Sequence, residues 1–327
     1  MSLTTKITFN KEINYLLKLG DGRICLSYDN TILILNKITF KIEIIKVGTH
    51  KKVINSLSQL EDGKLISCAN EPILNIYNIG ENYLSIAQKI DIFSKIPKDL
   101  TKKFKYLFKA AELINKDLAI CGAFPILTFY EYNSLKELYD FKYYIHNKTE
   151  ENIKDFKQIN QNQIILVTSK SYSLGCNTRI KLCDLEKKEI KEKSIITHAG
   201  KYLGESICKI SEFYLAIGVK NSILIFDLKK LKRIKEYNIS EYFRNLCVFG
   251  NYLFCGTNDG IIYKYAINED KLELKTTIKQ DNDAPIDSLI KLKKKTMVFS
   301  QMGTIFMNHL IENNCHAFGI LATISFF

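Results

Sequence analysis

Four cysteines recur at similar places in the chain and could, by residue type, bind a metal ion. Cys25, Cys68, Cys121 and Cys255 each lie ten or eleven residues before the end of a similar β-rich segment. A zinc site needs ligands that converge to about 2.3 Å from one ion. Matching positions on separate segments do not converge, so we expect these cysteines to be small buried packing residues and predict no metal site.

Histidine is the other residue type that could perform chemistry here. The chain has His50, His146, His198, His309 and His316, but no HExxH, no Gly-x-Ser-x-Gly and no glycine-rich phosphate loop followed by Lys-Ser/Thr. A catalytic histidine needs an oriented partner, and no local motif supplies one. We therefore predict a protein that is not an enzyme, with no catalytic residue, no cofactor and no small-molecule substrate.

Composition limits the class of protein further. The 327 residues are 46% hydrophobic, which is enough to bury a core and excludes intrinsic disorder. No stretch of about eighteen uncharged apolar residues occurs, so we expect no membrane span. The first residues have no apolar export signal, and the cysteines form no CxxC pair, which together favour an intracellular protein, cytoplasmic or nuclear.

The net charge of +12 comes mainly from lysine. Only four of the 47 basic residues are arginine. Nucleic-acid sites favour arginine because its guanidinium makes bidentate contacts to phosphate and guanine. The charge is therefore more typical of a solvated lysine surface than of a nucleic-acid site.

Seven similar β-rich segments follow one another along the chain. Each alternates apolar and polar residues as a strand does, and they cover residues 31–36, 73–78, 126–131, 178–184, 222–227, 261–266 and 304–308. Another strand and a hairpin turn, such as Asp29-Asn30 or residues 258–260, precede each segment. A further apolar run comes before that strand, and a charged strand such as residues 41–46 follows the segment.

Each unit is thus predicted to be a four-stranded antiparallel meander. The first three strands are apolar enough to lie between neighbouring units, while the charged fourth strand suits an exposed edge. Seven such units predict an all-β fold, a seven-bladed β-propeller. We place the blades at about residues 11–47, 53–91, 106–144, 153–196, 205–239, 243–279 and 285–312.

The units resemble WD repeats, whose signature ends a strand with Trp-Asp. Every Trp is replaced in this chain, which has Leu35-Asn36, Tyr77-Asn78, Tyr130-Glu131, Cys183-Asp184, Phe226-Asp227, Tyr265-Ala266 and Met307-Asn308. The family's Asp in the hairpin turn is similar to Asp29 and Asp259, each seven residues before the end of its segment. The family's Gly-His element is similar to Gly48-Thr49-His50 and to Thr197-His198.

The resemblance implies structural roles for His50, His198, Asp29, Asp259, Asp184 and Asp227. In the family, the His, the turn Asp, a strand Ser or Thr and the Trp form a hydrogen-bonded tetrad within a blade. No single unit here keeps all four types, so we expect the blades to depend more on apolar packing. The resemblance also implies that residues 4–9 supply the outer strand of the last blade; the apolar tail, 313–327, is the competing candidate.

Three insertions into the repeat are the best candidates for a functional surface. They cover residues 91–105 between the second and third blades, 144–152 between the third and fourth, and 170–178 within the fourth. Because loops between blades and hairpins between second and third strands emerge on one face in this family, we expect all three on one face. The candidate contact residues are Lys95, Lys98, Lys102, Lys103, Phe104, Lys105, Lys170, Tyr172 and Arg179.

In the first insertion, apolar residues such as Phe93, Ile96 and Leu100 alternate with the lysines. Such a mixture suits an acidic protein surface or a nucleic-acid backbone equally well. We predict a non-enzymatic protein-interaction scaffold, or a subunit of a larger intracellular complex, that binds partners through this face. An RNA-associated propeller that contacts phosphates through its lysines is the alternative, and an enzyme with an unrecognised site in a central channel is a third hypothesis.

Overall fold

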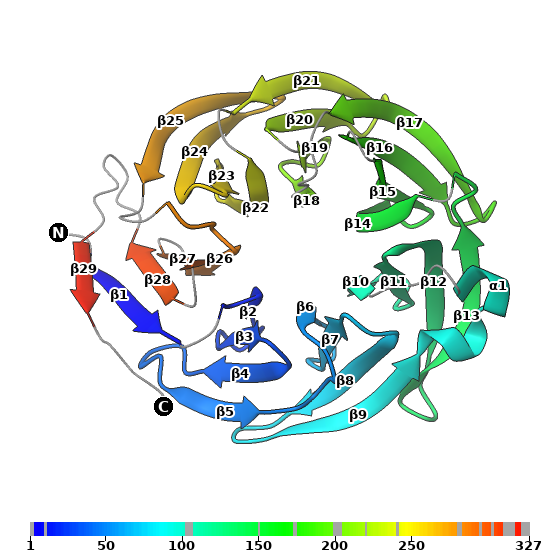
Figure 1. Ribbon diagram of the computed structural model, residues 1–327, viewed down its shortest axis with the longest axis horizontal. Helices are drawn as coiled ribbons and strands as arrows, with labels where there is room; N and C mark the ends of the chain where they lie inside the picture. The colour runs from blue at the N-terminus through cyan, green and yellow to red at the C-terminus, as the bar shows by residue number, and fades with distance from the viewer. Residues whose placement is uncertain are drawn as a thin grey trace. The chain divides into compact units, whose positions relative to one another are not determined.

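Nearly all of the regular structure consists of β-strands. The computed structural model describes residues 3–9, 12–101, 107–149, 151–172, 175–198, 205–219, 221–239, 242–279, 283–293, 296–301, 304–309 and 318–321. These residues form seven sheets, six of four strands and one of five. The fold is the predicted all-β, seven-bladed β-propeller, and Figure 1 labels its strands in chain order.

The first four blades follow the predicted meander, each with four strands in sequence order. They contain β2 (Tyr15–Lys18), β3 (Ile24–Tyr28), β4 (Thr31–Leu35) and β5 (Ile42–Lys46); β6 (Ile54–Gln59), β7 (Leu65–Ala69), β8 (Ile73–Ile79) and β9 (Leu84–Asp91); β10 (Leu107–Glu112), β11 (Leu118–Gly122), β12 (Phe124–Asn133) and β13 (Leu138–His146); and β14 (Asn152–Asn160), β15 (Gln163–Tyr172), β16 (Gly175–Asp184) and β17 (Glu189–His198).

The fifth and sixth blades repeat the same order. They contain β18 (Glu205–Lys209), β19 (Tyr214–Val219), β20 (Ser222–Asp227) and β21 (Lys232–Asn238), then β22 (Phe243–Phe249), β23 (Tyr252–Thr257), β24 (Ile261–Asn268) and β25 (Lys271–Lys279).

The seventh blade combines both ends of the chain. Its own strands are β26 (Ser288–Lys293), β27 (Thr296–Gln301) and β28 (Thr304–His309). β1 (Leu3–Thr8) pairs with β28 in antiparallel register, so the N-terminal strand completes the blade as predicted. β29 (Phe318–Leu321) then pairs with the other edge of β1 in parallel, which adds a fifth strand. The residue limits of the blades and of the tail stay predictions.

Burial along the strands explains why the repeats form sheets. In the second blade, all five residues of β7 are buried, whereas only two of the eight residues of β9 are buried. A strand that is buried on both faces reads as a continuous apolar run, while a partly solvated outer strand carries charges that discourage pairing with other chains. The hairpin turns use positive φ, as at Asp29 (50°) and Gly260 (72°), which matches their turn-forming sequences.

Within each compact unit, apolar cores lie between successive sheets. The chain divides into two compact units, one of Met1–Lys18 with Tyr202–Phe327 and one of Leu19–Lys201. In the second unit, one core joins the second and third blades and another joins the third and fourth. In the first unit, similar cores join the fifth and sixth blades and the sixth and seventh. The described part of the chain holds no helix with the length and hydropathy that a membrane crossing requires.

Candidate functional site

The described residues of the three insertions lie at one end of the third and fourth blades. Leu107, which follows the first insertion, pairs with Gly122, and Ile126 pairs with His146, so the first two insertions meet this end of the third blade. In the fourth blade, Asn152 pairs with Ser169, next to the hairpin that contains the third insertion. We call this the insertion end; it supports the expectation that the insertions share a face.

The described part of the first insertion, residues 91–101, packs against the blades. After β9 come a 3₁₀ turn, Ile92–Lys95, and one short helical turn, α1 (Lys98–Thr101). Ile92 and Ile96 are buried in the core between the second and third blades, with Leu100 packed against it. Ile96 therefore belongs to the core and Leu100 is half-buried, because burying them removes apolar area from water. Figure 1 shows α1 beside β12 and β13.

The charged candidates of this insertion fall into two groups. The side chains of Lys95 and Lys98 are exposed at the insertion end. Lys102, Lys103, Phe104 and Lys105 lie outside the described residues, as do the side chains of Lys170 and Tyr172 at the end of β15. The role of all six in partner binding stays a prediction.

A buried ion network fixes the second insertion to the fourth blade. The Glu151 side chain is 1% exposed and lies 2.7 Å from Arg179 Nη1 and 2.8 Å from Lys181 Nζ. Thr168 donates its hydroxyl to the same carboxylate at 2.8 Å. Arg179 Nε also lies 3.2 Å from Glu192 Oε2, so this candidate contact residue takes part in two ion pairs, one with the second insertion and one within its own blade.

Lys181 completes the network from the strand. Its ammonium donates to Asn147 Oδ1 at 2.8 Å and to Thr149 Oγ1, and Asn147 in turn donates its backbone N–H to Pro125 O at 2.7 Å. Burial acts to raise the pKa of Glu151, but the hydrogen bonds from Lys181 and Thr168 and the nearby charges hold that pKa below its ordinary value. The insertion is thereby a firmly held part of the blade.

The buried lysine stands where the family signature has Trp. A β-bulge precedes the signature position in five blades, directly before Leu35, Tyr77, Tyr130, Phe226 and Tyr265. In the fourth blade the bulge falls between Ile180 and Lys181. The prediction that Cys183-Asp184 is the signature pair was therefore wrong by two residues, because the longer strand β16 continues past the signature position.

The second blade keeps a complete polar tetrad. His50 Nδ1 lies 2.6 Å from Glu71 Oε1, and His50 Nε2 lies 2.6 Å from Ser67 Oγ, which is 3.3 Å from the Tyr77 hydroxyl. Glu71 replaces the turn Asp and Tyr77 replaces the Trp. No blade keeps all four residue types of the family, but here Glu71 and Tyr77 supply the acceptor and the ring of an equivalent hydrogen-bonded network.

This tetrad orders its atoms as a Ser-His-acid triad would, but it is buried in the blade. Ser67 is 0% exposed, and Asn75 Nδ2 also lies 3.2 Å from His50 Nε2. Burial lowers the pKa of His50, in opposition to the hydrogen bond with Glu71, so the neutral ring is favoured. Nδ1–H then donates to Glu71, and Nε2 accepts from Ser67.

The other predicted structural residues lie in turns. Asp227 Oδ1 accepts the backbone N–H groups of Lys229 and Lys230 at 2.8 and 2.9 Å, and Asp184 Oδ1 accepts that of Lys187 at 3.0 Å. Such Asx contacts hold the turn between the third and fourth strands.

In the hairpins, Asp29 accepts the Ile54 N–H through its backbone carbonyl at 2.8 Å, and Asp259 lies half-buried in the turn between β23 and β24. The side chain of His198 lies outside the described residues.

The four recurrent cysteines lie on second strands and are buried. They occupy β3, β7, β11 and β23, and burial raises the pKa of Cys68 to about 12. Within the described ranges, no three His, Cys, Asp or Glu side chains are grouped so that they could hold a metal ion. Their arrangement is that of packing residues, one to a blade.

Comparison with known proteins supports the fold. No family model matches the sequence, and no curated protein is significantly similar to it. Among solved structures, U3-55K is similar with a TM-score of 0.72 at 10% identity, over 92% of this chain and 96% of that one. The WD40 repeats of RRP9 give 0.72 at 10% identity, over 92% and 95%.

A chain in the mitotic checkpoint complex is also similar, with a TM-score of 0.69 at 8% identity over 93% of both chains. At such low identity the likeness concerns the fold, and it agrees with the seven sheets described above. The protein therefore folds as a seven-bladed β-propeller, and this fold is similar to that of solved WD40-repeat proteins.

Proposed function

We propose that the protein is a non-enzymatic interaction scaffold, or a subunit of a larger intracellular assembly, that binds partner proteins through the insertion end. The observation that carries the proposal is the meeting of the three insertions at one end of two adjacent blades. Loops held by a rigid scaffold are the usual place for binding residues. The buried network around Glu151 holds one of these loops in place, which lowers the entropy lost on binding.

The comparisons add support by analogy. One similar structure is that of the mitotic checkpoint complex, an assembly of several proteins by its title. Propellers host many unrelated functions, so the function of this chain must be inferred from its own surface residues. Exposed Lys95 and Lys98 would meet acidic groups of the partner.

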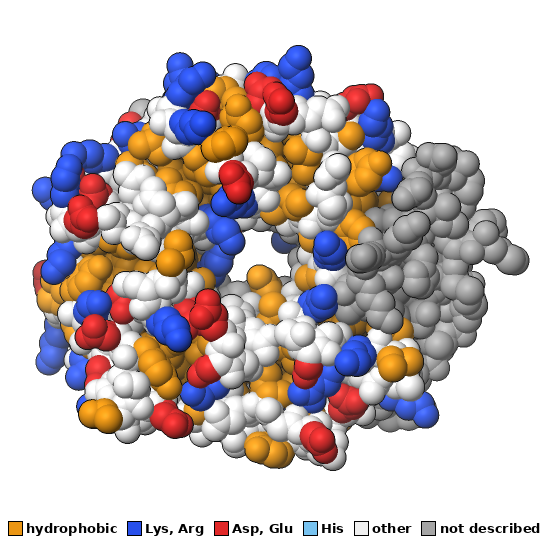
Figure 2. Space-filling model, turned by 180° about the vertical axis from the view of Figure 1, so that it is seen from behind, with side chains coloured by type: hydrophobic (Ala, Val, Ile, Leu, Met, Phe, Trp, Pro, Cys, Tyr) orange, Lys and Arg blue, Asp and Glu red, His pale blue; other side chains and the backbone are white. Residues whose placement is uncertain are grey.

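The alternative, RNA binding through lysines, has less support from the face drawn in Figure 2. On the face drawn in Figure 2, lysine and arginine side chains are interspersed with aspartate and glutamate. Phosphate binding favours a continuous basic area, since several contacts must release counterions together. A steep fall of affinity for RNA with rising salt would favour this alternative.

The test compares two charge-reversal variants of the tagged full chain, expressed in the cells of origin. Lys95→Glu with Lys98→Glu changes the insertion end, while Lys41→Glu with Lys187→Glu changes exposed turns at the other end of their blades. Bound proteins are identified by mass spectrometry, and the affinity of each purified partner is then measured. We expect the first variant to lose partners that the control variant retains. Equal binding by both variants would contradict the proposal.

A further inference from the structure

The end of the blades opposite the insertions carries a repeated contact between neighbours. Gln59 Oε1 accepts the N–H of Gly20 at 2.7 Å, and Gln158 Oε1 accepts the N–H of Ile114 at 2.7 Å. Between them, Glu112 Oε2 accepts the N–H of Glu61 at 2.6 Å. In each case a residue at or near the end of a blade's first strand binds the turn of the preceding blade. We call these three contacts the turn clasps.

Glu112 differs from the two glutamines because its second polar atom, Oε1, cannot donate a hydrogen bond. Gln59 Nε2 donates to Gly63 O at 2.9 Å, and Gln158 Nε2 donates to Gln161 O at 3.4 Å, so each amide also binds its own turn. A carboxylate has no hydrogen to donate. Among the described residues, Glu112 Oε1 instead receives the Tyr139 hydroxyl at the long distance of 3.5 Å.

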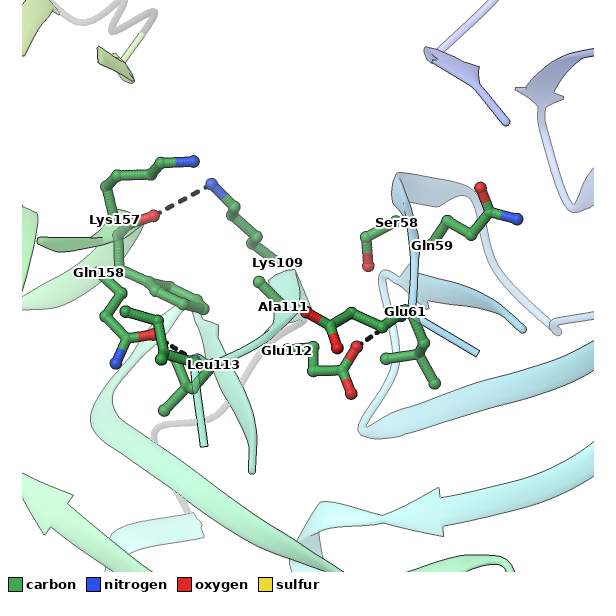
Figure 3. A pocket seen from close by; sticks show the side chains of 12 residues that line it. Ser58, Gln59, Glu61, Lys109, Ala111, Glu112, Leu113, Lys157 and Gln158 are labelled. Atoms are coloured by element: carbon green, nitrogen blue, oxygen red, sulfur yellow. Dashed lines mark hydrogen bonds between the residues drawn. The ribbon is translucent and has the colours of Figure 1, made fainter. Parts of the chain in front are cut away.

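The surroundings of Glu112 are acidic as well as partly buried. Burial raises the pKa of Glu112, while the hydrogen bond from the backbone N–H of Glu61 lowers it. The negative charges of Glu61 and Asp62 raise this pKa further. Figure 3 shows the carboxylates of Glu61 and Glu112 turned toward each other. Two carboxylates in such proximity favour a cation between them.

The clasp of Glu112 opens into a hollow of about 450 Å³ formed by β6, β10 and β14. Ala111, Leu113 and Ile114 supply apolar lining beside the two carboxylates, and Ile114 is 61% exposed. Lys109, also in the lining, is already paired with Asp155 at 2.5 Å. In Figure 3 the ammonium of Lys157 lies on the opposite side from the carboxylates. The charge of the hollow is thus divided between two walls.

We propose that this hollow is a second binding site, which takes one lysine or arginine side chain of a partner polypeptide. The cationic group donates to the Glu112 and Glu61 carboxylates in charge-assisted hydrogen bonds. The aliphatic stem packs against Ala111, Leu113 and Ile114, as long basic side chains do when the charged head stays polar. The site is separate from the insertion end, so its success or failure does not depend on the function proposed above.

Glu112→Gln is the informative variant and is expected to fold, because glutamine already occupies the equivalent position in the two neighbouring blades. The new amide matches Gln59 and Gln158, so it keeps the clasp to the N–H of Glu61 and gains a donor for its own turn. We expect the melting temperature to be retained or raised. Lys157→Glu is the opposite change, since it adds an acidic group to the other wall of the hollow.

The probe is a displayed library of random nine-residue peptides, selected on the full chain and counter-selected on the Glu112→Gln variant. We expect the recovered peptides to share a lysine or arginine, and replacing it by glutamine should weaken binding about tenfold, the value of one charge-assisted hydrogen bond. Lys157→Glu should tighten binding of the same peptides. Recovery of peptides without a basic residue, or of none that distinguishes the two chains, would overturn the proposal.

Discussion

Replacing Lys181 by methionine tests the buried network most sharply. The side chain of Lys181 is 2% exposed and that of Glu151 is 1% exposed, and their charged atoms are 2.8 Å apart. Methionine fills a similar volume without a charge. The variant leaves the Glu151 carboxylate buried with Arg179 and Thr168 as its remaining partners.

The expected decrease in the free energy of unfolding follows from the cost of leaving a buried charge without its partner. Removing one member of a buried pair costs about 3–5 kcal/mol, and the remaining Arg179 contact places this case near about 3 kcal/mol. With an unfolding entropy of about 2.1 cal/mol/K per residue, the melting temperature should fall by about 4 °C if the whole chain unfolds together, and by about 8 °C if residues 19–201 unfold alone.

The assay is thermal unfolding followed by circular dichroism at several pH values. The Glu151–Lys181 pair contributes its full stabilisation when the pH is above 4.5, the ordinary carboxyl pKa. That stabilisation is lost as the pH falls through the lowered pKa that Glu151 has in the folded state. The gap between wild type and variant should therefore shrink on acidification. Lys191→Met, at an exposed ion pair, is the control and should leave the melting temperature unchanged. A Lys181→Met variant that melts within about 1 °C of wild type would refute the reasoning.

Three further outcomes follow from the blades. Ser67→Ala should lower the free energy of unfolding, measured by urea denaturation, by about 1–2 kcal/mol, because it leaves His50 Nε2 without its hydroxyl partner. Ser27→Ala is the control and should lower it less, because that buried hydroxyl has no partner among the described residues. Gly218→Ala would place a Cβ 2.1 Å from the ring of Phe243 and should cost about 2–3 kcal/mol; an unchanged thermal melt would exclude this close packing. Because burial lowers the pKa of His50, the urea midpoint should fall as the pH decreases through 6.5, and a His50→Gln variant that keeps this dependence would contradict the assignment.

The strand order could be predicted from the sequence because the pattern repeats. Alternating apolar segments, turn residues with positive φ and a charged fourth strand all indicate the same four-stranded unit. The tetrad of the second blade was missed because it uses Glu71 and Tyr77 instead of Asp and Trp. A signal was present, since Glu71 lies seven residues before Asn78, the same spacing that Asp29 has from Asn36.

The buried network and the hollow could not be read from the sequence. Lys181 looks like any surface lysine of an alternating strand, and only the bulge register places it at the signature position. Glu112 and Gln158 belong to different blades, and their equivalence appears only when each binds the turn of its neighbour. Contacts between blades depend on tertiary packing, which local patterns do not encode.

The most direct test of the proposed function is hydrogen exchange of the full chain, measured with and without a partner purified from the cells of origin. The account predicts slower exchange at the insertion end, in residues 92–101 and 147–152, when the partner is bound. The Lys95→Glu and Lys98→Glu variant should lose that protection. Protection that appears elsewhere while these segments exchange at their free rate would contradict the account.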